Sequence, residues 1–437
     1  MSLTNALFSS VSGLETASTQ ISVIGDNIAN ASTPGFKEKR AEFSAVLGQS
    51  ITAGSGFAQI GAGVLTNDIG TIFTQGVFET TQRPTDLGIS GRGFFVLEGG
   101  FGRSYTRSGI FGFDSEGFLV DPNNNRLQGY GIDQATGNSN GVLGDIQVNL
   151  PLSPPQRTSS IELGLNLPSD GDDSQVTGPF DPADAEATSN AREVVQIYDS
   201  LGTPRQATVF FTKTGQNEWE YNVALAADDA DPADNPGGDP YVIQSDGAAT
   251  GTLSFDNQGN LVSHTPPASL FFDYDPSTTG AASGQVVTLA FENASGSVST
   301  TQYGPNFVTN FVSQDGFESG TLSALDFDED GKLNGVFTNG VTSSLAQIAL
   351  ANFGNVEGLS EIGRSQVIES VESGPPVIAA AGSGNLGSIR NSSLEKSNVD
   401  LAQQFVNLIV SQRAFQANTR TVSVANELLA NLVSLGQ

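Results

Sequence analysis

Apolar residues recur every seven positions at both ends of this chain. In residues 1–30 the repeated positions are Leu7, Leu14, Ile21 and Ile28. In residues 397–437 they are Leu401, Leu408, Phe415, Val422 and Leu429, and a second set four residues later comprises Phe405, Gln412, Thr419, Asn426 and Val433. Such spacing places the repeated side chains along one face of an α-helix. We therefore predict two amphipathic helices that pair as a coiled-coil core domain made of residues 1–33 and 391–437.

The predicted helices have weak apolar faces. The second C-terminal set is polar at three of its five positions, and the N-terminal helix has Ser18 and Gly25 at matching positions. Isolated helices of this kind are marginal in water. We expect both ends to be largely disordered in a single chain and to become helical when copies associate. Ser397, with Asp400 three residues later, is the expected cap of the C-terminal helix.

The middle of the chain has the pattern of β structure. Short β-branched or aromatic runs alternate with Gly, Asn and Asp, and predict strands at 93–98, 194–198, 207–212, 218–224, 286–291 and 347–352. The sequence Phe-Asp-x-x-Gly-x-Leu occurs three times, at 113–119, 255–261 and 327–333. Because Asp favours the start of a tight turn and Gly supplies a positive φ, each copy predicts a β-hairpin.

Shifts in composition divide the chain into nested parts. Residues 34–70, rich in Gly and Ala, suggest an extended linker, and the Pro-rich stretch 151–158 suggests a hinge. The expected domains are an inner β domain at 71–157 and 309–390, and an inserted acidic outer β domain at 158–308. The predicted fold class is α+β, with terminal helices and two nested, mainly antiparallel β domains of barrel or sandwich type.

Charge is distributed unevenly along this acidic chain. The formal net charge is -29, and residues 158–308 hold 21 acidic residues against Arg192, Arg205 and Lys213. Nucleic acid is an unsuitable partner, since phosphate binding needs clustered Lys and Arg. The terminal segments are near neutral and can pack against copies of themselves, whereas the middle presents a hydrated, repelling surface. A salty habitat would also account for the acidity.

The residue inventory offers little chemistry. The chain has no Cys and one His, His264, which excludes disulfides, thiol catalysis and multi-His metal sites.

The segment Asp326-x-Asp328-x-Asp330 resembles the start of a calcium loop, but position twelve is Phe337 where a Glu is needed. We interpret it as a turn, with loose calcium binding left open. The carboxylates at 170–173 are expected in a solvated loop and His264 in a surface loop, so no catalytic, cofactor-binding or metal-binding residues are predicted.

The N-terminal segment lacks the features of a cleaved secretory leader. Its first basic residue is Lys37, and no apolar run approaches the roughly 20 residues that span a bilayer. We expect neither a cleaved signal peptide nor membrane insertion.

Two stretches carry a resemblance to a known family. Asn27-Ile-Ala-Asn-Ala-Ser-Thr-Pro-Gly-Phe-Lys37 and Val410-Ser-Gln-Arg-Ala-Phe-Gln-Ala-Asn418 resemble the two signatures of the flagellar axial family of rod, hook and hook-associated proteins. Gly91-Arg-Gly-Phe-Phe-Val96 and Tyr105-Thr-Arg-Ser-Gly109 are similar to its hook branch. The resemblance covers about 1–150 and 310–437. The matching signature residues are Asn27, Asn30, Pro34, Gly35, Phe36, Gln412, Arg413 and Asn418.

The resemblance implies a structural, non-enzymatic role. Subunits of the hook branch polymerise into a flexible helical tube that couples rod to filament and transmits torque as a universal joint. It implies these partners: copies of the chain, a rod protein proximally, a hook-associated junction protein distally, a hook cap protein and the flagellar export apparatus. It also implies an extracellular location in the hook and basal body, reached without a cleaved signal peptide. The expected assembly core comprises Leu7, Leu14, Ile21, Ile28, Leu401, Phe405, Leu408, Phe415, Val422 and Leu429.

Two other interpretations stay open. A distal rod protein of the same family is disfavoured by the length of the chain and by the insert at 158–308. A secreted acidic β-rich surface protein is the second interpretation. It would not need the seven-residue apolar repeats that both ends of this chain contain. A hydrolase on a β scaffold is disfavoured because the sequence offers no nucleophile and base pair.

Overall fold

In the computed structural model the protein has an α+β fold of two compact units. It describes residues 3–53, 56–100, 102–133, 136–148, 152–169, 179–235, 237–244, 250–265, 270–292 and 299–435. Unit 1 contains Met1–Asn149, Ser323–Val336 and Thr342–Gln437, and unit 2 contains Leu150–Leu322 and Phe337–Val341. The inserted domain was expected at 158–308. Unit 2 extends beyond both of these predicted bounds. Within the described residues, no helix has the length and apolar character needed to cross a membrane.

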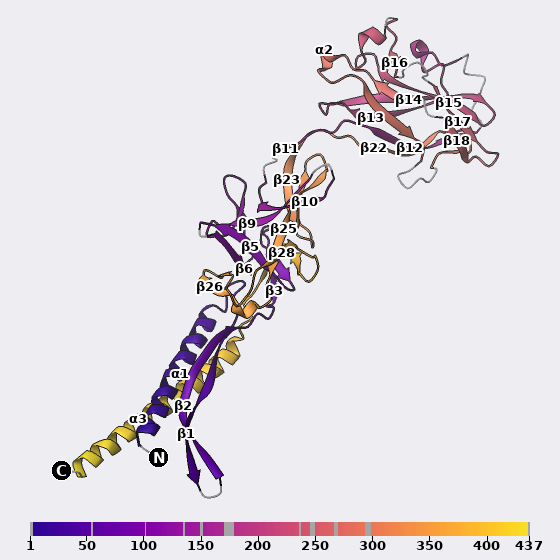
Figure 1. Cartoon of the computed structure of the whole chain (residues 1–437). Helices are drawn as coiled ribbons and strands as arrows, with labels where there is room; N and C mark the ends of the chain where they lie inside the picture. The colour runs from indigo at the N-terminus through magenta and orange to yellow at the C-terminus, as the bar shows by residue number, and fades with distance from the viewer. Residues whose placement is uncertain are drawn as a thin grey trace. The chain divides into compact units, whose positions relative to one another are not determined.

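Two long helices run antiparallel in unit 1. Helix α1 (Leu3–Ala29) and helix α3 (Leu401–Leu435) lie side by side (Figure 1). Asn27, near the end of α1, lies 3.4 Å from Gln404 at the start of α3, and Gly13 lies against Asn418. The N-cap of α3 is Asp400, not Ser397, because the Asp400 carboxylate accepts hydrogen bonds from the first free backbone N–H groups.

The face of α3 that packs on α1 uses small and polar residues. Gln404, Ser411 and Ala425 are buried and Asn418 is half-buried, each one position before a member of the predicted second set. Within this chain, the second set itself is exposed at Phe405, Gln412, Thr419 and Asn426. The seven-residue spacing predicted that the second set lies on the packed face. Small residues instead allow close approach of the two helices, and the large ones point elsewhere.

The expectation of an extended linker at 34–70 is wrong. Strands β1 (Lys39–Ala53) and β2 (Gly56–Thr71) form an antiparallel hairpin, in register from Lys39 opposite Thr71. The hairpin lies along α1, where Ser12 Oγ accepts a hydrogen bond from Val64 N at 3.2 Å. Gly and Ala are poor strand formers, so the segment lacks a local signal. Pairing with the other arm and with α1 stabilises the strands instead.

The β domain of unit 1 is built around one large sheet. Its central strands follow the order β24-β25-β9-β5-β6-β27-β26. Strand β5 is buried on both faces, with Phe95 and Leu97 in one apolar cluster and Phe94 and Val96 in another. The elements of this domain are β3 (Phe78–Thr80), β4 (Gly88–Ser90), β5 (Phe94–Gly99), β6 (Gly102–Thr106), β7 (Gly112–Phe113), β8 (Leu119–Val120), β9 (Arg126–Ile132), β10 (Ser139–Asp145), β24 (Lys332–Phe337), β25 (Thr342–Asn352), η3 (Val356–Gly358), β26 (Ser360–Gly363), β27 (Gln366–Ile368), β28 (Val377–Ala380), β29 (Ser388–Arg390) and β30 (Ser393–Glu395), and β23 (Gly320–Phe327) crosses from unit 2.

Unit 2 has two sheets around a shared apolar core. One sheet has the order β19-β20-β12-β21 with β22 added on β12, and the other has the order β13-β14-β15-β17-β18 with β16 added on β15. Side chains from both sheets, including Leu163, Phe211 and Trp219, form the core. The elements are β11 (Leu152–Ser153), β12 (Ser160–Leu167), η1 (Pro182–Asp184), β13 (Ala191–Tyr198), β14 (Pro204–Gly215), β15 (Glu218–Ala226), η2 (Pro232–Asp234), β16 (Tyr241–Ile243), β17 (Thr250–Phe255), β18 (Leu261–Thr265), β19 (Leu270–Phe272), α2 (Pro276–Thr279), β20 (Gln285–Ala290), β21 (Thr301–Gln302) and β22 (Val308–Gln314).

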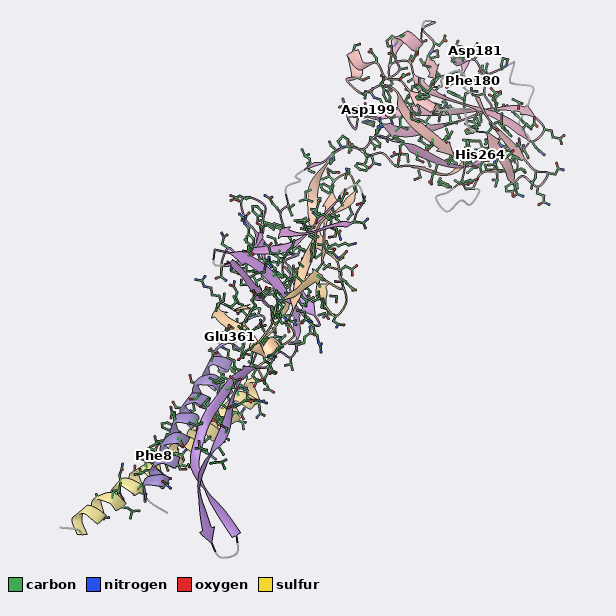
Figure 2. All side chains as sticks on the ribbon, viewed as in Figure 1. Phe8, Phe180, Asp181, Asp199, His264 and Glu361 are labelled. Atoms are coloured by element: carbon green, nitrogen blue, oxygen red, sulfur yellow. The ribbon has the colours of Figure 1, made fainter. Side chains whose placement is uncertain are left out.

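The strand predictions are confirmed, and so are the turns of the repeated motif. In all three copies the Asp carboxylate accepts backbone hydrogen bonds across the turn, and the Gly has a positive φ of 73° to 82°. Asp199 and Gly202 build the same turn in unit 2 without the flanking Phe. His264 is not in a loop but in β18, where its Nδ1 is buried without a partner among the described residues (Figure 2).

The close packing of α1 on α3 gives a first testable prediction. A Cβ added at Gly13 would lie 2.7 Å from Asn418 Nδ2, whereas at Gly25 of the same helix it would meet nothing within 4 Å. Replacing Gly13 with Leu should destabilise the helix pair by about 1–3 kcal/mol through overpacking. Thermal melting of the associated form, followed by far-ultraviolet circular dichroism, measures the effect.

Gly25→Leu is the matched control for the same helix. It should leave the melting temperature unchanged or raise it, because Leu has a higher helix propensity than Gly. Equal melting of both variants would contradict the packing of Gly13 on Asn418.

Candidate functional site

The most elaborate polar site in unit 1 is the junction between the terminal helices and the β domain. Here the chain leaving α1 passes beside the chain that leads from β30 into α3, and Gly35 N donates to Glu395 O at 2.8 Å. Gly35 has a φ of +72°, and an added Cβ would lie 2.5 Å from Ser108 N. Only glycine fits this turn, which explains its place in the N-terminal signature.

A buried carboxylate, Glu395, holds the junction together. Its side chain is 0% exposed and lies 2.6 Å from Lys37 Nζ and 3.4 Å from Arg107 Nη1. The same carboxylate accepts a hydrogen bond from Gly76 N at 2.8 Å. Lys37 also donates to Thr74 O at 2.8 Å, and Arg107 donates to Gly91 O at 2.9 Å. The three charged groups thus connect five separate segments of the chain.

Burial works against the charged form of both cations. It lowers the pKa of Lys37 and that of Arg107, and attraction to Glu395 offsets only part of each change. Two cations therefore share one carboxylate in a dry environment. Removal of the carboxylate would leave both cations without their ionic partner, which is the costly way to break a buried ion pair.

Amide side chains add a second set of contacts around the ion cluster. Asn27, 1% exposed, donates to Lys39 O at 2.8 Å and accepts from Lys39 N at 2.9 Å. Gln404 at the start of α3 donates to the Glu38 carboxylate at 2.7 Å, and Asn398 accepts from Glu38 N at 2.7 Å. These bonds fix the direction in which both helices leave the β domain.

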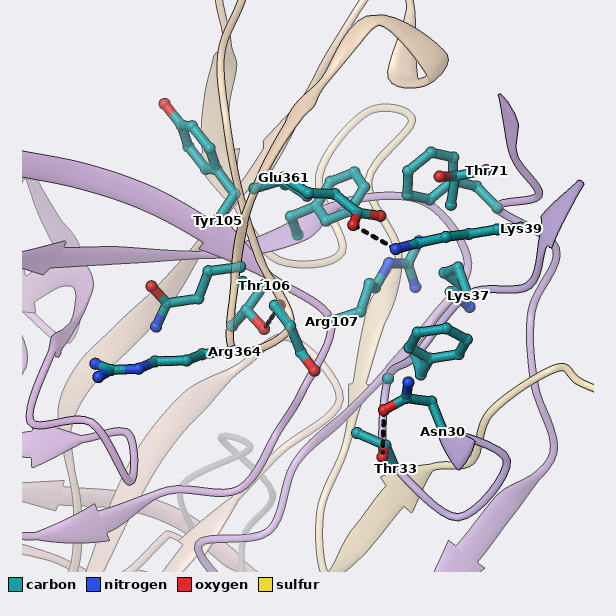
Figure 3. A pocket seen from close by; sticks show the side chains of 18 of the residues that line it. Asn30, Thr33, Lys37, Lys39, Thr71, Tyr105, Thr106, Arg107, Glu361 and Arg364 are labelled. Atoms are coloured by element: carbon teal, nitrogen blue, oxygen red, sulfur yellow. Dashed lines mark hydrogen bonds and ion pairs between the residues drawn. The ribbon is translucent and has the colours of Figure 1, made fainter. Parts of the chain in front are cut away.

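A cavity of about 360 Å³ opens beside the junction (Figure 3). Lys39 lies at its edge, 2.7 Å from a Glu361 oxygen and 3.3 Å from an Asp26 oxygen. Burial alone would lower the pKa of Lys39, but the two carboxylates outweigh burial and raise it. Tyr105 also lines the cavity, and burial raises its pKa to about 12. Lys39 is therefore a cationic bridge between α1 and the β26–β27 hairpin.

The structure brings together only part of the predicted signature. Asn27, Gly35 and the adjoining Lys37 belong to the junction. Asn30 donates to Asp26 O at 2.9 Å and closes the last turn of α1, while Pro34 and Phe36 are half-buried. The C-terminal signature lies elsewhere: Gln412 and Arg413 are exposed on α3, and Asn418 packs on Gly13.

The expected assembly-core residues are partly solvent-exposed in this single chain. Leu7, Leu14, Ile21, Ile28, Leu408, Val422 and Leu429 are half-buried. Leu401, Phe405 and Phe415 are 44%, 50% and 38% exposed. Their role between copies stays a prediction, considered below.

Sequence analysis missed the centre of the junction. Glu395 lies in a stretch without apolar periodicity. No local pattern indicates that its carboxylate is buried in an ion pair with Lys37. Arg107 stood within the motif Tyr105-Thr-Arg-Ser-Gly109, which was the available signal. The residues that bury this charge are distant from it in the sequence. The sequence alone therefore does not reveal that the charge is buried.

The carboxylates considered as metal ligands from sequence do not gather into a metal-binding group in the part of the chain that the structure describes. No group of three or more His, Asp or Glu side chains could hold a metal ion in that part of the chain. Asp328 instead accepts a hydrogen bond from Lys332 N at 2.8 Å, as a turn residue does. The carboxylates at 170–173 lie outside the described residues.

The buried carboxylate gives a second prediction. Glu395→Gln keeps the shape of the side chain but removes its charge, so Lys37 and Arg107 lose their shared ionic partner. We expect unit 1 to lose about 3–5 kcal/mol of unfolding free energy. Urea unfolding followed by circular dichroism measures it.

Glu79→Gln is the matched control, since Glu79 pairs with Lys396 at 3.0 Å but both side chains are more than half exposed. Exposed pairs contribute little to stability, so this variant should unfold almost as the parent chain does. A Glu395→Gln chain as stable as Glu79→Gln would refute the central role of the junction.

Four family models match the chain in sequence order. They are Flagella basal body rod protein at residues 7–37, Flagellar hook protein FlgE/F/G D1 domain at 88–170, Flagellar basal body protein FlaE D2 domain at 166–317 and Flagellar basal body rod FlgEFG protein C-terminal at 390–435. The first match ends at Lys37 and the last begins just before Glu395, so the junction joins the two terminal modules to the D1 module.

Relatives with the same modules match almost from end to end. The flagellar hook protein FlgE of Treponema pallidum is 33% identical across 98% of this chain and 99% of the relative, and that of Escherichia coli is 33% identical across 98% and 100%. The crystal structure of the Helicobacter pylori flagellar hook protein FlgE2 shares the fold, with a TM-score of 0.51 at 14% identity, over 73% of this chain and 100% of that chain. Because full-length relatives match at this level, the chain belongs to the flagellar hook protein family.

Proposed function

We propose that copies of this chain polymerise helically into the hook of a bacterial flagellum, a short curved tube that couples rod to filament. In this role the tube transmits torque while it bends, as a universal joint. The chain is a structural subunit with no catalytic step in its function. The match of 33% identity over almost the whole length of flagellar hook proteins favours the hook over the rod.

The observation that carries the proposal is a set of large apolar side chains left exposed on the terminal helices. On α3 the exposed fractions are 50% at Phe405, 50% at Ile409 and 47% at Leu428, and on α1 the exposed fraction of Phe8 is 70%. Figure 2 labels Phe8 on its helix. Two helices that pair through small and polar residues leave these side chains for another partner. Burial between copies would contribute roughly 1.5–3 kcal/mol for each fully buried side chain.

The expected assembly core follows from this division of the helix faces. It comprises the half-buried and exposed apolar residues Leu7, Leu14, Ile21, Ile28, Leu401, Phe405, Leu408, Phe415, Val422 and Leu429. We infer that these side chains complete a coiled-coil packing only when copies associate. Unit 2, which contains the acidic segment 158–308, would face solvent. Its hydrated surface would make weak contacts that slide as the tube bends.

The proposed setting defines the partners. A rod protein would bind the proximal end of the tube and a hook-associated junction protein the distal end. During assembly the chain would leave the cell through the flagellar export apparatus, without a cleaved signal peptide, and add beneath a hook cap protein. The mature location would be extracellular, in the hook and basal body.

Polymer formation is the direct test of the assembly core. Purified chain salted out of solution should form tubes visible by electron microscopy. Leu408→Asp combined with Phe415→Asp should abolish the tubes, because two charges would enter the apolar contact, while unit 2 stays folded. Gln416→Asp, at an exposed polar position of the same helix, is the control and should still give tubes. Tubes from the double variant would show that α3 does not form the core.

Folding on association is a separate prediction. Because the α1–α3 contact is rich in small and polar residues, the two helices should be largely unfolded in the monomer. Far-ultraviolet circular dichroism of monomer and polymer should show more helix in the polymer. Equal helix content in both would refute this part of the proposal and leave the polymer itself intact.

A further inference from the structure

Unit 1 contains a second cavity, of about 290 Å³, on the β domain. Its apolar wall includes Phe73, Phe94 and Phe353, whose rings pack edge to face with centroids 5.7 and 6.0 Å apart. Two guanidinium groups, those of Arg92 and Arg107, complete the lining, and none of the lining residues is acidic. Arg107 is paired with Glu395 at 3.4 Å, so Arg92 is the cation of this lining that has no carboxylate partner among the described residues.

The backbone holds Arg92 in a fixed loop. The glycines on either side have φ angles of +112° and +121°, a region in which other residues are strained. Arg92 O accepts a hydrogen bond from Gly387 N at 2.7 Å, and Gly91 N donates to the Gln75 side chain at 3.2 Å. The Arg92 side chain itself is exposed and has no hydrogen bond or ion pair with any residue that the structure describes. A rigid loop therefore presents an unpaired cation at the cavity.

The second cation, Arg107, also has unused hydrogen-bonding capacity. Its side chain is 9% exposed, and its Nη atoms bind Glu395, Ile89 O and Gly91 O. Its Nε, however, is buried without a partner among the described residues. The guanidinium carbon lies 5.3 Å from the centre of the Phe94 ring. One N–H of this guanidinium is therefore left without an acceptor among the described residues.

The chemistry of this cavity fits an acidic side chain. A guanidinium binds a carboxylate through paired N–H groups, and the aromatic wall suits the aliphatic stem of Glu or a neighbouring apolar residue. We propose that the cavity lined by Arg92 and Phe353 receives a carboxylate side chain from a second copy of this chain. This inference rests on the proposed polymer and adds a specific lateral contact to it.

Charge complementarity identifies a second copy as the occupant. The chain has 47 acidic residues against 18 basic ones, so each cation exposed at a contact faces an excess of carboxylates from its neighbours. Inside a polymer those carboxylates are present at very high local concentration. Once the cavity is covered, its apolar wall excludes water and strengthens the pair, so added salt should weaken it less than an exposed pair.

Charge reversal tests the contact. Arg92→Glu should raise the monomer concentration that coexists with polymer by about tenfold or more, because a carboxylate would then face a carboxylate. Arg103→Glu is the control: Arg103 is also exposed on the β domain, pairs with Glu98 at 3.7 Å and does not line the cavity. Pelleting the polymer and measuring the soluble chain gives both values. If Arg92→Glu behaves as Arg103→Glu does, the inference is overturned.

Site-specific cross-linking identifies the occupant independently of polymer yield. The chain has no Cys, so Arg92→Cys accepts a single photoactivatable thiol label. In the polymer the label should cross-link a segment containing Asp or Glu from another copy, as located by mass spectrometry. Cross-links confined to the same chain, or to segments without acidic residues, would overturn the inference while leaving the proposed tube intact. Failure of the parent chain to form tubes would overturn both.

Discussion

The burial of one carboxylate determines much of the architecture of unit 1. The Glu395 side chain has no exposure to water, so its carboxylate depends on polar partners supplied by other segments. Lys37 comes from the turn after α1, Arg107 from the chain just after β6, and Gly76 from the loop after the β1–β2 hairpin. The ends of both helices and the hairpin are thereby held at one edge of the β domain. The amide contacts of Asn27, Asn398 and Gln404 then orient them.

The helix pair beyond the junction has the opposite character. It is joined by small and polar residues, with Gly13 against Asn418 and Ala425 and Ser411 buried on the same face of α3. Close approach of helices through small residues gives good van der Waals contact but buries little apolar area. The large side chains stay available on the outer faces. Under the proposed assembly, these side chains would gain their burial from contact with other copies.

Sequence alone predicted the elements better than their contacts. The helices, the six strands and the three Asp-Gly turns follow local rules, and the structure confirms them. The hairpin at 39–71 was missed because its Gly and Ala residues carry no strand signal of their own. The second set on α3 was predicted one residue out, because seven-residue spacing was taken as the mark of the face that packs on α1, whereas Gln404, Ser411 and Ala425 are buried. Glu395 was missed because its partners Lys37 and Arg107 are 358 and 288 positions away.

That separation has a consequence for how the molecule is made. A chain that emerges N-terminus first presents Lys37 long before Glu395 exists. Until the last forty or so residues have emerged, Lys37 and Arg107 lack their acidic partner. The turn after α1 then also lacks its contact with Glu395. Unit 2 depends on no such late residue, since its sheets are complete by Val341. A copy truncated before Glu395 would therefore keep the sheets of unit 2 but would lack the carboxylate that pairs with Lys37 and Arg107.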